Sequence, residues 1–125
     1  MTGQGRKRRG RDTEHLVAAW LAENGWPDAH ATGAGTPGPD VLGVPWDVEV
    51  KARRGLDLGA LLRQLAARRT DRLGIGVIRL DGAGPTTLGD WPVVMTLADF
   101  ARLTRTTLDP RTTTPTERNS HGIPE

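Results

Sequence analysis

Residues 46–52 read Trp-Asp-Val-Glu-Val-Lys-Ala and alternate between apolar and charged side chains as far as Lys51. A hydrophobic period of two residues is typical of a β-strand with one face turned to the core. The three apolar side chains therefore share one face of the strand, and Asp47, Glu49 and Lys51 share the other. This strand is the point from which the rest of the fold is predicted.

The segments on either side complete a small α/β (α+β) domain. Apolar spacing, together with the positions of Gly and Pro, predicts helices over about 13–24, 58–69 and 97–105, and strands within 28–38, 41–44, 74–80 and 91–96. Asp12 or Thr13 is expected to cap the first helix. The resulting order is α-β-β-β-α-β-β-α, which suggests a mixed central sheet flanked by helices.

Length and composition exclude several classes of protein. The chain has 125 residues, enough for one domain, and no Cys, which excludes a disulfide scaffold, a thiolate metal site and a cysteine nucleophile. No apolar run approaches the roughly 18 residues of a membrane span, so we expect no membrane and a cytoplasmic location. We expect a flexible basic arm over 1–11, the domain over 12–105 and a disordered tail over 106–125.

Positive charge is concentrated in two segments although the net charge is only +2. Residues 1–11 carry five basic and no acidic side chains, and residues 51–72 carry seven basic and two acidic ones. Such a chain can present a positive face to a phosphate backbone, and the alternative is a solvated face with a basic tail. The expected phosphate contacts are Arg6, Lys7, Arg8, Arg9, Arg11, Arg53, Arg54, Arg63, Arg68 and Arg69.

A candidate reactive site lies on the charged face of the central strand. Glu49 and Lys51 are two residues apart and project together, and Asp40 can join them if its strand pairs with theirs as a hairpin. Converging carboxylates repel one another, and a hard divalent cation such as Mg²⁺ relieves that cost. Lys51 is a compact point charge suited to holding a water against a phosphate. The alternative is an exposed face with a cross-strand ion pair.

Two further acids have open interpretations. Glu14 lies three residues before Val17 and so borders the apolar stripe of the first helix. It either faces inward towards a metal or its water shell, or stays on the surface and stabilises the helix N-terminus. Asp47 shares the face of Glu49 and Lys51, where we expect an edge position or a surface ion pair, and the alternative is a contact with the shell of the metal.

The motif region resembles a known enzyme superfamily. Residues 32–42 read Thr-Gly-Ala-Gly-Thr-Pro-Gly-Pro-Asp-Val-Leu, and residues 48–51 read Val-Glu-Val-Lys. Together they resemble the PD-(D/E)xK nucleases, and within them the small archaeal-type Holliday-junction resolvases and their phage or bacterial relatives. The resemblance covers about residues 10–104 and implies a restriction-endonuclease-like α-β-β-β-α-β core with a central mixed sheet flanked by helices.

The resemblance also implies site residues. The catalytic residues that it implies are Glu14, Asp40, Glu49, Lys51 and Gln64. The metal ligands that it implies, for Mg²⁺ or Mn²⁺, are Asp40, Glu49 and the Val50 main-chain carbonyl, with Glu14 as a further candidate.

The implied function is a metal-dependent endodeoxyribonuclease acting on branched DNA. A homodimer is expected, because resolving a junction requires two symmetric cuts. Two alternatives remain. One is a nuclease of the same superfamily for another DNA substrate, of restriction or repair type. The other is a non-catalytic DNA-binding module that uses the same basic faces.

Overall fold

The computed structural model describes residues 3–33, 35–52, 55–68 and 71–108, with side chains from residue 12 to residue 105 of these ranges. The chain forms two compact units, Met1–Met95 and Thr96–Glu125. The described part of the first unit contains the sheet, two α-helices and a short 3-10 helix. The described part of the second unit contains helix α3 (Leu97–Leu108).

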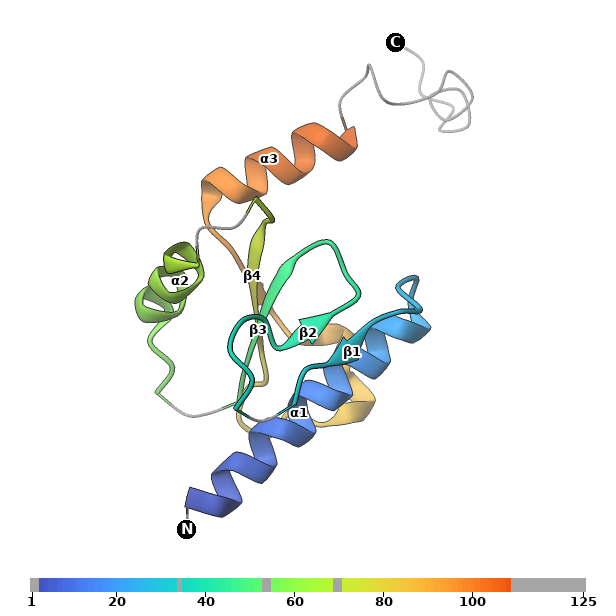
Figure 1. The fold of residues 1–125 in the computed structure, drawn as a ribbon, viewed down its shortest axis with the longest axis vertical. Helices are drawn as coiled ribbons and strands as arrows, with labels where there is room; N and C mark the ends of the chain where they lie inside the picture. Colours follow the sequence, from blue (N-terminus) through green and yellow to red (C-terminus); the bar gives the residue numbers. More distant parts are fainter. Residues whose placement is uncertain (1–2, 34, 53–54, 69–70, 109–125) are drawn as a thin grey trace. The chain divides into compact units, whose positions relative to one another are not determined.

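A five-stranded mixed sheet forms the centre of the first unit (Figure 1). Its strands, in the spatial order β1-β2-β3-β4-β5, are β1 (His30–Ala31), β2 (Val41–Leu42), β3 (Asp47–Lys51), β4 (Gly74–Ile78) and β5 (Val93–Val94). The β3–β4 pair is parallel and the other three pairs are antiparallel. The predicted strand from the alternating segment is therefore confirmed, and it is the central strand.

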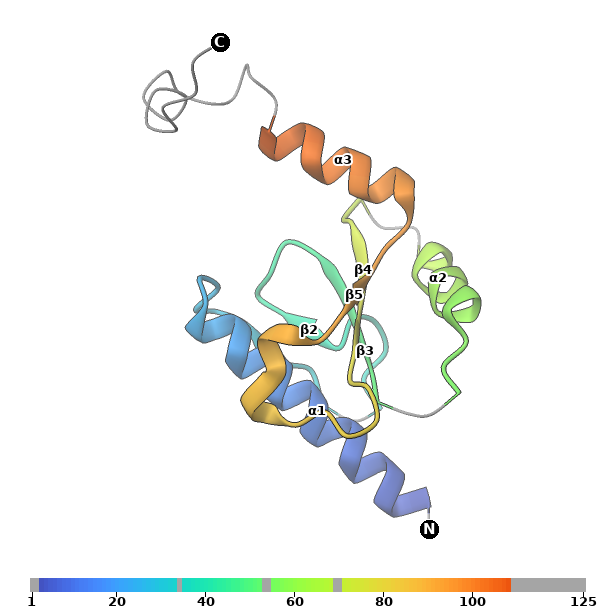
Figure 2. The same cartoon turned by 180° about the vertical axis from the view of Figure 1, so that it is seen from behind.

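Two helices cover the two faces of this sheet. Helix α1 (Gly3–Glu23) lies on one side of β3 and β4, and helix α2 (Leu58–Ala67) lies on the other (Figure 1). A parallel strand pair needs a crossover connection, and α2 provides it between β3 and β4. The short 3-10 helix η1 (Pro85–Asp90) lies beside α1 in the loop before β5 (Figure 2). The predicted order of helices and strands is confirmed.

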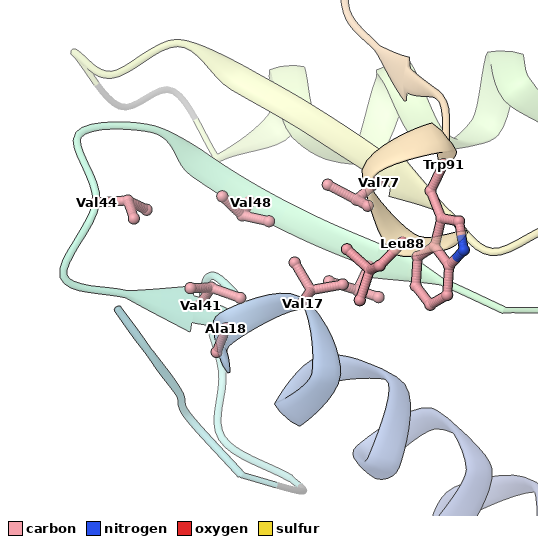
Figure 3. Close-up of a cluster of buried hydrophobic side chains, with 9 residues drawn as sticks. Val17, Ala18, Val41, Val44, Val48, Val77, Leu88 and Trp91 are labelled. Carbon is pink, nitrogen blue, oxygen red and sulfur yellow. The ribbon is translucent and has the colours of Figure 1, made fainter. Parts of the chain in front are cut away.

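The larger apolar core lies between α1 and the sheet (Figure 3). Helix α1 contributes Val17 and Ala18, which are 2% and 3% exposed, and η1 and the residue after it contribute Leu88 and Trp91. The strands and the loop between β2 and β3 contribute Val41, Val44, Val48, Val50 and Val77. The apolar face predicted for the central strand therefore packs in this core, opposite α1.

A smaller core lies under α2. Leu61 and Leu65 pack with Ile78, and all three are buried. A Cβ placed on Gly76 would lie 2.6 Å from Cδ2 of Leu61, so the absence of a side chain at this position lets α2 approach β4 closely. At the start of α2, the Asp57 side chain caps the helix by accepting a hydrogen bond of 3.0 Å from the Ala60 amide.

The main difference from the sequence prediction is the start of the first helix. Helix α1 begins at Gly3, so Asp12 and Thr13 lie inside it and do not cap it, and residues 3–11 of the expected basic arm are helical. Arg and Lys have high helix propensity, no Pro precedes residue 27, and extending a packed helix costs less than nucleating one.

Smaller differences concern the ends of other elements. Helix α3 continues to Leu108, three residues beyond its predicted end, so residues 106–108 of the tail expected over 106–125 are helical, and residues 109–125 lie outside the described residues. The strand predicted over 91–96 forms only at Val93–Val94. None of the described helices is both long enough and apolar enough to span a bilayer.

We expect Leu61→Ala to lower the free energy of unfolding by about 2–5 kcal/mol, because Leu61 is 2% exposed and its removal leaves a cavity against β4. Urea denaturation of the full chain measures the change. Leu58→Ala, on the same helix at a position that is 48% exposed, is the matched control and should cost clearly less. Equal losses for the two variants would contradict this packing.

Candidate functional site

The pairing of β2 with β3 brings Asp40 to Glu49. The antiparallel register pairs Val41 with Val48, so one step further along Asp40 lies across from Glu49. The Asp40 amide donates to the Val48 carbonyl at 2.8 Å, and its carboxylate Oδ2 accepts from the Val50 amide at 2.8 Å. The predicted hairpin is confirmed, and Asp40 is held by two bonds to the backbone of β3.

Glu49 and Lys51 face the same way on β3, as the strand period predicts. Lys51 Nζ lies 3.1 Å from Glu49 Oε2, and their side chains are only 18% and 8% exposed. The alternative of an exposed strand face is therefore wrong, because this pair lies in a largely desolvated place where charges interact more strongly than in water.

Arg68, which caps the C-terminus of α2, binds the same strand face. One guanidinium nitrogen donates to Asp47 Oδ1 at 2.7 Å, and another donates to Glu49 Oε1. Both carboxylate oxygens of Glu49 are thus bound by cations, one from β3 and one from α2. Arg68 was predicted to contact phosphate, whereas its guanidinium is directed at these two carboxylates.

Asp47 is buried, so the expectation of an edge position or surface ion pair was wrong. Its side chain is 2% exposed, and a buried carboxylate requires a cationic or hydrogen-bonded partner, which Arg68 supplies. The sequence contains a signal for this placement. The apolar stripe of the helix predicted over 58–69 must cover one face of the sheet, and the face with Asp47 is the one that the first helix leaves uncovered.

Glu14 of α1 joins the same carboxylates. Its pKa is raised to about 7, chiefly because burial removes the carboxylate from water. The negative charges of Asp40 and Glu49 raise this pKa further, and a hydrogen bond with Asp40 favours the protonated form of Glu14. Its Oε1 is buried without a hydrogen-bond partner among the described residues. Because α1 begins at Gly3, Glu14 lies in the middle of the helix, and the surface interpretation at a helix N-terminus was wrong.

The charged groups of this site, together with their burial, shift the pKa values of Asp40 and Arg68. Burial raises the pKa of Asp40, as does Glu49, although the hydrogen bond from the Val50 amide lowers it. Burial lowers the pKa of Arg68, but its hydrogen bonds to Glu49 and Asp47 outweigh this and leave that pKa raised. These six side chains form what we call the acidic cluster: Glu14, Asp40, Asp47, Glu49, Lys51 and Arg68.

The acidic cluster has the composition of a site for a hard divalent cation. Four carboxylates face two cations, which leaves two surplus negative charges when all are ionised. Glu14, Asp40 and Glu49 offer carboxylate oxygens, the donors that Mg²⁺ and Mn²⁺ prefer, and the unpartnered Oε1 of Glu14 lacks the partner that an ion would supply. In donor type, though not in a preassembled arrangement, these residues suit such an ion.

No set of three or more Asp, Glu or His side chains is preassembled around one point in the part of the chain that the structure describes. Glu49 is bound by Lys51 and Arg68, and Asp40 by the Val50 amide, so these groups are satisfied within the protein. Metal binding would require an ion to share or replace those contacts.

The other predicted site residues are not members of the acidic cluster. Gln64 is exposed on α2, four residues before Arg68 and therefore on the same side of the helix, and Arg63 is also exposed. The roles of Gln64 and of the Val50 carbonyl stay predictions. Outside the described side chains lie Arg6, Lys7, Arg8, Arg9, Arg11, Arg53, Arg54 and Arg69.

No protein-family model, curated protein or solved structure matches this chain.

The raised pKa of Glu14 predicts a pH-dependent stability in EDTA. Its folded value of about 7 exceeds its ordinary 4.5, so the protonated side chain favours the fold, and that contribution is lost as the pH rises from about 4.5 through 7. We expect the free energy of unfolding to fall over this range, and to fall less in Glu14→Gln. Part of the pH dependence should remain in Glu14→Gln, because the pKa of Asp40 is also raised.

Urea denaturation at a series of pH values measures this dependence. Glu23→Gln is the matched control, because Glu23 is exposed at the end of the same helix. If Glu14→Gln and the unaltered chain show the same pH dependence, Glu14 does not lie among the carboxylates as described.

Proposed function

We propose that this protein is a metal-dependent endodeoxyribonuclease of the PD-(D/E)xK type, with a restriction-endonuclease-like fold, acting on branched DNA such as a four-way junction. The carrying observation is the convergence of Asp40 and Glu49, from two strands, with Lys51 in one largely buried cluster. Glu14 adds a carboxylate from a third element. Phosphodiester hydrolysis requires groups of these types, because negative charge must be stabilised at the phosphate and a water must be oriented.

Each protein group has a defined task in this proposal. Asp40, fixed by two bonds to β3, and Glu49 would hold Mg²⁺ or Mn²⁺ together with the Val50 carbonyl, with Glu14 as a further ligand. The bound ion supplies positive charge that polarises the scissile phosphate and lowers the pKa of a bound water. Lys51, whose side chain is 18% exposed, would orient the attacking water and offset charge on the phosphoryl oxygens.

DNA contact is assigned to the basic residues around the site. Arg63 is exposed on α2, the helix that ends at the acidic cluster, and is available to a phosphate. A homodimer is part of the proposal, since two symmetric strands of a junction must be cut. The substrate alternative is a nuclease of the same type for flaps or linear duplex.

A second candidate is a non-catalytic DNA-binding module. It is favoured by the double pairing of Glu49, which both Lys51 and Arg68 bind in the way of a structural ion-pair network. The two candidates differ in one observable, because only the nuclease shows cleavage that requires a divalent cation.

Lys51→Ala tests the catalytic assignment. We expect it to lower the cleavage rate by about a hundredfold or more, because the group that stabilises charge at the phosphate is lost, while DNA binding changes little. Cleavage is followed on gels with Mg²⁺, Mn²⁺ or EDTA, and binding by gel shift in EDTA. Arg102→Ala, at an exposed ion pair with Asp99, is the control. Unchanged cutting by Lys51→Ala would remove Lys51 from the mechanism, and no metal-dependent cutting by the unaltered chain would favour the binding module.

A panel of four DNAs tests the substrate. A four-way junction, a flap, a linear duplex and a single strand are incubated at equal concentration with the purified chain and Mg²⁺. We expect the junction to be cut fastest, with paired cuts, and the chain to sediment as a dimer. Equal cutting of all four would contradict the junction preference and leave the nuclease proposal standing.

A further inference from the structure

Asp47 is the most buried acid of the described chain. It is 1% exposed, and its amide donates to the Leu73 carbonyl at 2.7 Å, at the point where the parallel strands β3 and β4 both begin. A carboxylate so placed is not positioned to touch a DNA phosphate or bulk water. The contact with Arg68 at 2.7 Å compensates the negative charge of Asp47. Asp47 therefore acts on the site through Arg68.

Arg68 joins Asp47 to Glu49 through two different nitrogens of one guanidinium. One nitrogen donates to Asp47 Oδ1 and the other to Glu49 Oε1. Because the guanidinium is planar and rigid, fixing one nitrogen on Asp47 also fixes where the other can meet Glu49. A lysine has a single charged nitrogen on a flexible stem and offers no such fork.

The two cations on Glu49 differ in what holds them. Lys51 lies on the same strand and has no fork, and in the proposed reaction it serves the water and the phosphate. Arg68 lies at the C-terminal cap of α2, and its guanidinium also binds the buried carboxylate of Asp47. When Lys51 is engaged by substrate, Arg68 still constrains the Glu49 carboxylate. Groups that bind the outer side of metal ligands orient those ligands and strengthen metal binding.

We propose that Arg68, anchored by the buried Asp47, is a positioning residue that orients Glu49 for a divalent cation. This inference rests on the proposed function, because it takes Glu49 to be a metal ligand. It assigns a role to two residues of which one was expected on the DNA-contacting face and the other on the surface.

Two variants of the full chain test the inference without DNA. Arg68→Lys keeps the positive charge and loses the fork, and Asp47→Asn keeps the shape and loses the anchoring charge. Titration calorimetry with Mn²⁺ alone measures the dissociation constant. We expect both variants to bind Mn²⁺ about tenfold or more weakly, as other losses of such partners do. Arg102→Lys, at an exposed ion pair, is the matched control and should bind as the unaltered chain does.

A second measurement separates positioning from a purely structural role. If Arg68 orients Glu49, saturating Mn²⁺ should restore much of the cleavage rate of Arg68→Lys, so that the half-saturating metal concentration shifts more than the maximal rate. Circular dichroism and urea denaturation check that the variants fold. Failure of both variants to fold would overturn the inference, because the bridge would then be structural.

The outcomes distinguish this inference from the proposed function. If the unaltered chain binds Mn²⁺ and cleaves DNA while Arg68→Lys and Asp47→Asn bind Mn²⁺ equally well, only the positioning role is overturned. Tighter binding by Arg68→Lys also overturns it, because Arg68 would then compete with the ion. If the unaltered chain neither binds Mn²⁺ nor cleaves DNA, both the proposed function and the inference are overturned.

Discussion

Burial of β3 on both faces is the constraint on which the rest of the structure depends. Val48 is fully buried on one face, while Asp47 and Glu49, on the other, are only 1% and 6% exposed. A strand with an apolar face can be covered by a helix at no electrostatic cost. A strand with carboxylates on its second face can be covered only if cations are buried with them, and Arg68 and Lys51 meet that requirement.

The same burial makes the ionised forms of two carboxylates at the site unfavourable. Desolvation raises the pKa values of Glu14 and Asp40, which shows that their ionised forms are costly in the folded state. Protonation relieves that cost, and so would a divalent cation. The features that lower the stability of the ion-free chain at neutral pH are therefore those that would favour an ion, as is common where strained groups serve a function.

The order of elements and the central strand could be predicted because their signals are local. The alternation over residues 46–52 needs only the period of a strand, and the spacing around Leu61 needs only that of a helix. The start of α1 could not be predicted in the same way, since residues 3–11 lack an apolar period and their helicity follows from continuity with the packed turns beyond them.

The sequence by itself determined which residues share a face, because side-chain direction follows from the backbone period. It placed Glu49 with Lys51, whereas the place of Asp40 depended on a strand pairing that the structure shows. Only the tertiary structure decided that Glu14 turns inward and that Arg68 binds Asp47 and Glu49. Those contacts join segments far apart in the chain, and their geometry depends on how α1 and α2 settle against the sheet, which is set by packing that no local pattern encodes.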